Sequence, residues 1–244
     1  MKQAITHIEE RIAQATLLSG RSPGSVTLIG VSKTHPAELV RAAYAAGIRH
    51  FGENRVQEAE SKIADCADLA GVEWHLIGHL QRNKAKKAAH LFAVIHSVDS
   101  LELAQALSRH AVDLGRPPIK ILLQCNVSGE ASKEGIAAEG WEANETLRAA
   151  IIALAQHIGA LPGLMLVGLM TVAPYSDDQT AVQGVFRSLR QLRDLLQQAM
   201  PLHQLTELSM GMSGDIEAAI AEGATMVRVG RAIFGERSYP EPSN

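Results

Sequence analysis

The stretch VTLIGVSK, residues 26–33, is the first of eight short, mostly apolar runs that predict buried β-strands. It ends on Lys33, which a strand would deliver to the rim of the fold. A lysine in that position is a candidate nucleophile, because burial and neighbouring charges decide whether its amine stays an ordinary cation. It is also commonly just a solvated residue after a strand. The rest of the chain has to decide between these two interpretations.

Segments of helical periodicity separate the eight runs, and no low-complexity linker divides them. Such alternation over 244 residues predicts a single domain, a (β/α)8 TIM barrel of class α/β, rather than an open doubly wound sheet. The domain would span residues 1–244, with an N-terminal helix within 1–20 and a polar tail at 236–244. Predicted strands are 26–33, 48–52, 73–78, 93–98, 119–127, 164–171, 205–211 and 226–230. Predicted helices are 2–19, 36–46, 54–69, 81–91, 100–114, 141–157, 178–200 and 215–222, with Ser100 capping the fifth and Asp177 or Asp178 the seventh.

The composition is that of an ordinary globular protein, with 46% hydrophobic and 20% charged residues. Lys plus Arg number 23 against 26 Asp plus Glu, and no basic block predicts a nucleic-acid surface. The chain shows neither a signal peptide nor a membrane-spanning apolar run. Cys66 and Cys125 have neither metal-site nor disulfide-framework spacing. We therefore expect a cytoplasmic monomer with no nucleic-acid or membrane partner.

Two glycine-containing loops stand where a TIM barrel places a phosphate site, after the seventh and eighth strands. They are SMGMSGD, residues 209–215, and VRVGRAIFG, residues 227–235. In the first loop, Ser213 and Gly214 lead into a helix and offer a hydroxyl and backbone N–H groups to an anion. In the second, Gly230 lets the backbone approach closely. Either loop alone is also typical of a turn that needs glycine, but together they predict a phosphate-binding cup.

An amine beside a phosphate cup describes a site for pyridoxal 5'-phosphate (PLP), with the cofactor held as a Schiff base. Lys33 would lie next to the cup, because the first and last strands are neighbours in a closed barrel. Arg228 lies two residues before Gly230, so it points the same way and can reach the pyridine nitrogen. A charged arginine there leaves the nitrogen unprotonated and weakens the electron sink. The alternative for Arg228 is an ion pair with Glu53 or Glu207.

Other candidates stand at the ends of further strands. Asn54 can bond the cofactor or cap the following helix, and His79 follows the third strand. Met170 ends the sixth strand, where plain packing is an equal alternative. Lys84 is a candidate second amine for moving the aldehyde in or out, or part of a solvated helix face. Residues 128–140 are predicted to form an exposed loop able to act as a lid.

Seven motifs carry a resemblance to the pyridoxal-phosphate homeostasis protein family, single-domain relatives of the alanine racemase N-terminal barrel. They are VSKTHP, FGENRVQE, WHLIGHLQRNK, CNVSGEASKEG, GLMTVAP, SMGMSGDIEAAIAEGATMVRVG and RAIFG, in order from residue 31 to 235. The resemblance implies a (β/α)8 barrel with PLP on Lys33 and Arg228 facing the ring nitrogen. The phosphate-binding positions that it implies are Ser213, Gly214, Gly230 and Arg231. Many members have threonine where this chain has Arg231, so only the backbone N–H carries over at that position.

The same resemblance implies a role in intracellular PLP (vitamin B6) homeostasis and amino-acid balance, without established catalysis and with apo-PLP enzymes as acceptors. The alternative is a PLP-dependent amino-acid racemase or lyase. Such enzymes need a second base and cover from water, which alanine racemases obtain from a second domain. GERSYPEPSN, residues 235–244, is too short and polar for that, so we expect little turnover. A third interpretation is a barrel enzyme for a phosphorylated sugar, with Lys33 as base or imine former.

Overall fold

The computed structural model describes residues 1–115, 117–130, 132–176 and 178–236. Its strands alternate with helices along the chain. The strands are β1 (Thr27–Val31), β2 (His50–Glu53), β3 (Glu73–Leu76), β4 (Val94–Val98), β5 (Ile119–Asn126), β6 (Ile136–Ala137), β7 (Leu164–Met170), β8 (Glu207–Ser209) and β9 (Met226–Val229). The helices are α1 (Lys2–Leu18), α2 (Ala37–Ala45), α3 (Val56–Asp65), the 3-10 turn η1 (Arg82–Lys84), α4 (Ala85–Leu91), α5 (Leu101–Asp113), α6 (Glu145–Gly159), α7 (Gln179–Ala199), α8 (Ile216–Ala221) and α9 (Arg231–Phe234).

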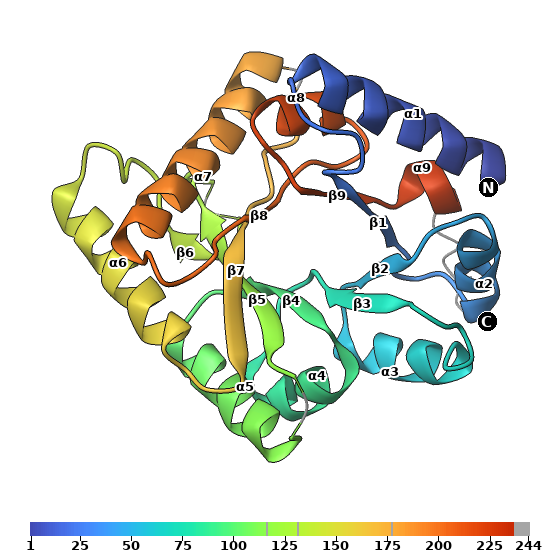
Figure 1. Ribbon diagram of the computed structural model, residues 1–244, viewed down its shortest axis with the longest axis horizontal. Coiled ribbons are helices and arrows are strands. Elements are labelled where there is room, and N and C mark those ends of the chain that lie inside the picture. Colours follow the sequence, from blue (N-terminus) through green and yellow to red (C-terminus); the bar gives the residue numbers. More distant parts are fainter. Residues whose placement is uncertain (116, 131, 177, 237–244) are drawn as a thin grey trace, which may run out of the picture.

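Eight of these strands close into a parallel barrel. The order is β4, β3, β2, β1, β9, β8, β7, β5, and pairing between β4 and β5 closes the ring. The short strand β6 adds to the edge of β5. Figure 1 shows the ring of strands inside a ring of helices. The prediction of a (β/α)8 barrel is therefore confirmed.

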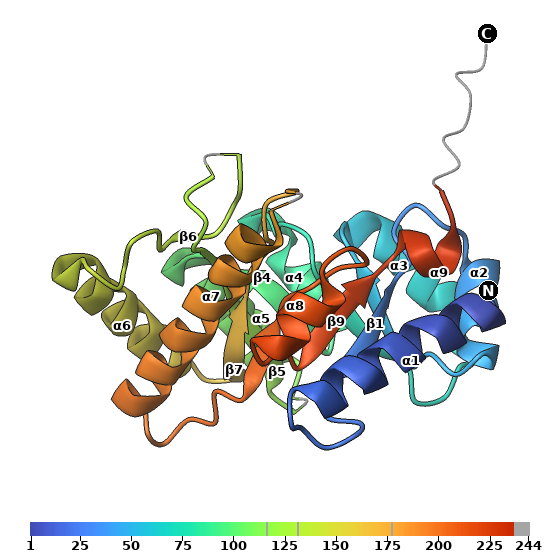
Figure 2. The same ribbon diagram turned by 90° about the horizontal axis from the view of Figure 1, so that it is seen from above.

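Helix α1 precedes the first strand and packs against α8 and α9, along the seam between β9 and β1 (Figures 1 and 2). Its buried face includes Ile5, Ile8, Ile12 and Ala15, which recur at helical spacing in the sequence, and also Thr16. The guanidinium of Arg11 reaches from α1 to the carbonyl oxygen of Ser213 at 3.2 Å. The N-terminal helix thus braces one of the loops above the barrel.

The core has two layers. The larger lies between the strands and the surrounding helices, where each helix buries one apolar face. The smaller lies inside the barrel and consists of Val94, Leu122, Val167 and Met170. These residues come from β4, β5 and β7, and polar side chains, among them His96 of β4, share the interior with them.

Several helix ends differ from the sequence predictions. Helix α6 begins at Glu145 rather than near Trp141, because the Asn144 side chain accepts a hydrogen bond from the Leu147 N–H at 3.0 Å. The Ser100 hydroxyl donates to Asp99 Oδ1 at 3.1 Å instead of capping α5. The Asp178 carboxylate does cap α7, bonding the N–H groups of Thr180 and Ala181.

Two predictions fall partly or wholly on residues that the structure does not describe, and a third changes in detail. Asp177, the other candidate cap, and residues 237–244 of the predicted tail lie outside the described residues. The predicted loop 128–140 contains the short strand β6.

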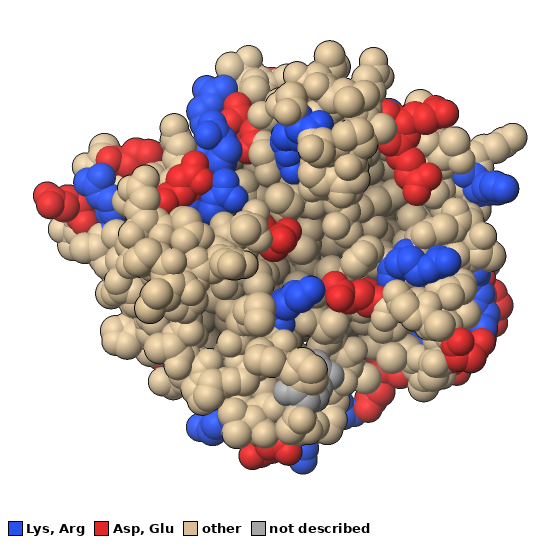
Figure 3. All heavy atoms as spheres, viewed as in Figure 1, with Lys and Arg blue, Asp and Glu red and all other residues tan. Residues whose placement is uncertain are grey.

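Among the described helices, none combines the length and apolar character needed to cross a bilayer. On the face seen in Figure 3, basic and acidic side chains are interspersed rather than gathered by sign.

Candidate functional site

A cavity of about 630 Å³ lies where the ends of β1 and β9 meet the loop after β8. This volume is within the range of roughly 300–1,000 Å³ that is typical of small-molecule sites. Its lining includes Lys33, Ser213, Gly214, Arg228, Gly230 and Arg231. The fold therefore brings together an amine, two glycine-containing loops and a buried guanidinium from distant parts of the chain.

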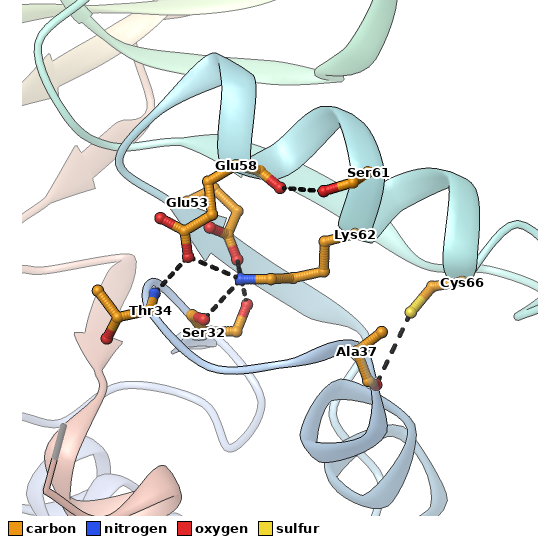
Figure 4. Close-up of polar contacts among 8 residues, drawn as sticks. All are labelled: Ser32, Thr34, Ala37, Glu53, Glu58, Ser61, Lys62 and Cys66. Carbon is orange, nitrogen blue, oxygen red and sulfur yellow. Dashed lines mark hydrogen bonds and ion pairs between the residues drawn. The ribbon is translucent and has the colours of Figure 1, made fainter. Parts of the chain in front are cut away.

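The backbone on both sides of Lys33 is held by a cluster of polar and charged residues that we call the Lys62 cluster: Ser32, Glu53, Glu58 and Lys62 (Figure 4). The Lys62 amine donates to the Ser32 carbonyl oxygen at 2.7 Å and to Glu53 Oε1 at 2.6 Å. The Ser32 hydroxyl donates to the same Glu53 oxygen at 2.6 Å. On the other side of Lys33, the Thr34 N–H donates to Glu58 Oε1. The cluster thus fixes the peptide groups that present the Lys33 side chain.

The Lys62 cluster contains a buried ion pair between Glu53 and Lys62, while the Glu58 side chain is 28% exposed. Glu53 is fully buried and Lys62 is 5% exposed. Burial raises the pKa of Glu53, while the Lys62 charge and hydrogen bond oppose that rise. Among the described residues, Glu53 Oε2 has no hydrogen-bond partner. The Lys62 charge therefore offsets the cost of burying the Glu53 carboxylate.

Thr34 adds backbone strain directly after Lys33. Its φ is 64°, in the left-handed region that a β-branched residue rarely adopts. Such strain persists only where the surroundings hold it in place, and it is concentrated at functional sites. The hydrogen bond from the Thr34 N–H to Glu58 is one such restraint. The end of β1 is thus a constrained turn rather than a relaxed flank.

The loop after β8 is suited to an anion. A Cβ on Gly211 would lie 2.6 Å from Ala219 Cβ, so this tight turn requires glycine. A Cβ on Gly214 would meet nothing within 4 Å, which leaves the backbone there accessible from the cavity. Asp215 also lines the cavity, and burial raises the pKa of its carboxyl group.

Gly230 lies close to β1, and Arg228 bonds residues of β8 and of the loop after β7. A Cβ on Gly230 would lie 3.3 Å from the Val31 carbonyl oxygen, so a side chain there would press on the strand that carries Lys33. Arg228 is 5% exposed and donates to Ser209 Oγ at 2.7 Å and to the Thr171 carbonyl oxygen at 2.9 Å. Burial lowers the pKa of Arg228 to about 10, opposed by Asp215, so its guanidinium remains charged at neutral pH.

The alternative partners predicted for Arg228 bond elsewhere. Glu53 pairs with Lys62 at 2.6 Å. Glu207 accepts a hydrogen bond from the Thr225 hydroxyl at 2.6 Å. The predicted ion pair of Arg228 with either carboxylate is therefore wrong, and Arg228 is held instead by neutral acceptors.

A chain of three histidines crosses the barrel interior from Ser209, the partner of Arg228. His96 Nδ1 lies 2.8 Å from Ser209 Oγ, and its Nε2 lies 2.9 Å from His75 Nδ1. His75 Nε2 in turn lies 3.1 Å from His50 Nδ1, at the opposite end of the barrel. Burial lowers the pKa of His96 well below its ordinary range and that of His75 to about 3. Both rings are therefore neutral imidazoles, each able to donate at one nitrogen and accept at the other.

The stability of the protein is expected to fall as the pH drops from about 6.5 toward 3. The pKa of His75 is about 3 in the fold against an ordinary value of 6.5, so the unfolded chain binds the proton first across this window. Urea unfolding between pH 7 and pH 4 should show a shallower pH dependence in His75→Gln than in the wild type. His157→Gln, on the exposed face of α6, should keep the wild-type slope. Equal slopes in all three proteins would contradict this account.

The remaining predicted site residues lie outside the main cavity. Asn54 and His79 line a neighbouring cavity of about 250 Å³, and Ile77 lines both. His79 Nδ1 lies 3.5 Å from Glu134 Oε2. Asn54 does not cap α3, because that helix begins at Val56 after Arg55.

Two further candidates are likewise displaced from the main cavity. Met170 is 1% exposed and belongs to the core inside the barrel, so it packs there, as the alternative interpretation of this residue predicted. Lys84 lines a third cavity, of about 450 Å³, together with Asn54 and His79.

Comparison with known proteins identifies the family. Residues 6–238 match the family model described as alanine racemase, N-terminal domain. A curated pyridoxal phosphate homeostasis protein of Pseudomonas aeruginosa is 46% identical over 98% of this chain and 97% of its own length. That of Vibrio cholerae is 42% identical over 98% and 97%. This chain belongs to the pyridoxal phosphate homeostasis protein family.

A solved member of the family is PipY of Synechococcus elongatus, whose structure has been determined with PLP bound. It is 45% identical, with a TM-score of 0.77 over 92% of this chain and 100% of that one. The same protein without PLP gives 46% identity and a TM-score of 0.79 over the same shares. Most of this chain therefore shares its fold with a protein solved both with and without PLP.

The functional neighbourhood of this family member includes residues that sequence reasoning missed. Lys62 and Glu58 lie four apart on α3, a spacing usually typical of an exposed helix pair. His35 lines the cavity and stacks on Phe234, with ring centroids 5.4 Å apart. Its position two residues after Lys33 is the feature of the sequence that could have indicated a place in this cavity. For His96, nothing in the local sequence indicates that it would lie beside Ser209.

Proposed function

We propose that this protein binds PLP as a Schiff base on Lys33 and holds it as part of cellular PLP homeostasis. The observation that carries the proposal is the single cavity that Lys33 shares with the loops at 213–214 and 230–231 and with Arg228. In this arrangement the Lys33 amine would bond the aldehyde. The loop N–H groups and the Ser213 hydroxyl would bind the phosphate, and the adjacent Arg231 charge would add to that attraction.

Arg228 would face the ring nitrogen as a charged donor, because its pKa stays near 10. A bound PLP supplies an electron sink, and that sink is strongest when its ring nitrogen is protonated. A guanidinium donates to the nitrogen and has no proton to give up at neutral pH. This favours holding the cofactor over turning over amino acids, in keeping with relatives that are named homeostasis proteins.

The test is to purify the full-length protein, record its visible spectrum and reduce it with borohydride. We expect an absorbance band beyond that of the polypeptide, and one pyridoxyl group per chain on the peptide that contains Lys33. A pyridoxyl group on another lysine, or none at all, would overturn the proposal. Incubation with L- and D-amino acids should give little racemisation or keto-acid release, and robust turnover would instead support the racemase or lyase alternative.

A further inference from the structure

At the opposite end of the barrel from Lys33, two histidines and a glutamate converge. His50 and Glu73 are the first residues of β2 and β3 and are paired in register, and His75 follows two residues later on the same face of β3. His50 Nδ1 lies 3.1 Å from His75 Nε2. Glu73 Oε1 lies 3.6 Å from the first nitrogen and 3.5 Å from the second. All three ligand atoms thus face one point.

We propose that His50, Glu73 and His75 form a binding site for a divalent transition-metal ion, with Zn²⁺ as the best-fitting probe. Bonds of about 2.0–2.1 Å in a tetrahedral zinc site separate neighbouring ligand atoms by roughly 3.3–3.4 Å. The three observed separations bracket that value. Two imidazoles and one carboxylate are a ligand set that zinc uses, with a fourth position left for water. This proposal does not rest on the proposed PLP binding.

The surroundings of His75 have the features of a built metal site. Its Nε2 faces the other two ligands, while its Nδ1 lies 2.9 Å from His96 Nε2. With the proton on Nδ1 donated to His96, the Nε2 lone pair is directed at the ion. His96 then accepts at Nε2 and can donate from Nδ1 to Ser209 Oγ, 2.8 Å away. Metal-bound histidines nearly always have such a second hydrogen-bond partner, which fixes the ring and its tautomer.

Access and charge also fit. The side chains of His50 and Glu73 are 35% and 32% exposed, so an ion can reach them from solvent, while His75 is buried. The Glu73 carboxylate would contribute one negative charge to the ligand set. One opposing group is present: the Lys120 amine lies 3.9 Å from Glu73 Oε2. Removing that charge should therefore strengthen metal binding.

The experiment is a Zn²⁺ titration of the untagged full-length chain after treatment with a chelator, using a chromophoric competitor. We expect one Zn²⁺ per chain and a thermal midpoint that rises with Zn²⁺. His50→Ala, which removes a ligand, and Glu73→Gln, which replaces a carboxylate ligand with a neutral amide, should each weaken binding about tenfold or more. Lys120→Met should tighten it severalfold. His157→Ala, an exposed histidine on α6, is the matched control and should leave it unchanged.

The variants are placed at the two partly exposed ligands because replacing buried His75 would disturb the core. Melting curves without metal establish that each variant is folded. Mg²⁺ should not compete, because imidazole ligands suit zinc rather than magnesium. Anomalous diffraction at the zinc edge would locate the ion among the three side chains. Absence of saturable binding, or full binding in both His50→Ala and Glu73→Gln, would overturn the proposal.

Discussion

Replacing Lys62 with methionine is expected to lower the free energy of unfolding by about 3–5 kcal/mol, because it leaves a buried carboxylate without its counter-charge. Glu53 is fully buried, and its Oε1 receives hydrogen bonds from Lys62 and Ser32 at 2.6 Å each. Without the Lys62 amine, only the hydrogen bond from the Ser32 hydroxyl would offset the cost of burying the Glu53 carboxylate. Equilibrium unfolding in urea at pH 7.5 would measure the loss.

Lys87→Met is the matched control for this change. Lys87 also pairs with a glutamate at 2.6 Å, but both partners are about half exposed. An exposed pair contributes about 0–1 kcal/mol, so the two lysine variants should differ by several kcal/mol despite equal ion-pair distances. Similar losses in the two variants would show that burial of Glu53 does not set the energy of the cluster.

A second variant separates charge from packing. Glu53→Gln combined with Lys62→Met removes both charges at nearly constant volume and should recover most of the stability, since an uncompensated buried charge is then absent. The stability lost in Lys62→Met relative to the wild type should also be smaller at pH 5 than at pH 8. Loss of Lys62 raises the folded-state pKa of Glu53 still further, so the folded state then binds the extra proton. Failure of the double variant to recover would point to packing by the Lys62 side chain.

The sequence predicts the barrel well because its strands are buried on both faces and stand out as short apolar runs between helical segments. All eight predicted strands overlap the observed ones. The errors lie at helix ends, where one side-chain hydrogen bond decides the boundary. Trp141 looks like a helix start but precedes it, because Asn144 provides the cap. Local periodicity does not reveal such a contact.

The candidate site likewise contains some residues that the sequence could predict and others that it could not. Residues at strand ends and in glycine-containing loops, such as Lys33 and Ser213, could be proposed because the barrel fixes where strand ends meet. The Lys62 cluster could not be proposed, since a glutamate and a lysine four apart normally form a solvated helix pair. In the fold, the Lys62 amine also bonds Glu53 Oε1 at the end of β2 and the Ser32 carbonyl oxygen just after β1, and the Lys62–Glu53 pair is buried. The histidine chain likewise depends on register between strands, which one sequence does not give.

Replacing Lys33 with alanine is expected to abolish the covalent attachment of PLP completely while leaving the barrel folded. A Schiff base requires an amine within bonding reach of the aldehyde, and within the described residues Lys33 is the lysine that lines the main cavity. The phosphate loops remain in the variant, so PLP should still bind weakly and dissociate on gel filtration. The measurements are the visible spectrum, the pyridoxyl mass after borohydride reduction and the thermal midpoint.

Lys84→Ala makes this result specific. Lys84 lies in a separate cavity with Asn54 and His79, so its loss should leave the spectrum and the single pyridoxyl group on Lys33 unchanged. If Lys33→Ala kept a stoichiometric pyridoxyl label on another residue, the main cavity would not be the PLP site. If Lys84→Ala lost the label, the covalent amine would belong to the third cavity, which Lys84 lines. A slower release of PLP in Lys84→Ala, with the label intact, would instead assign Lys84 to cofactor exchange.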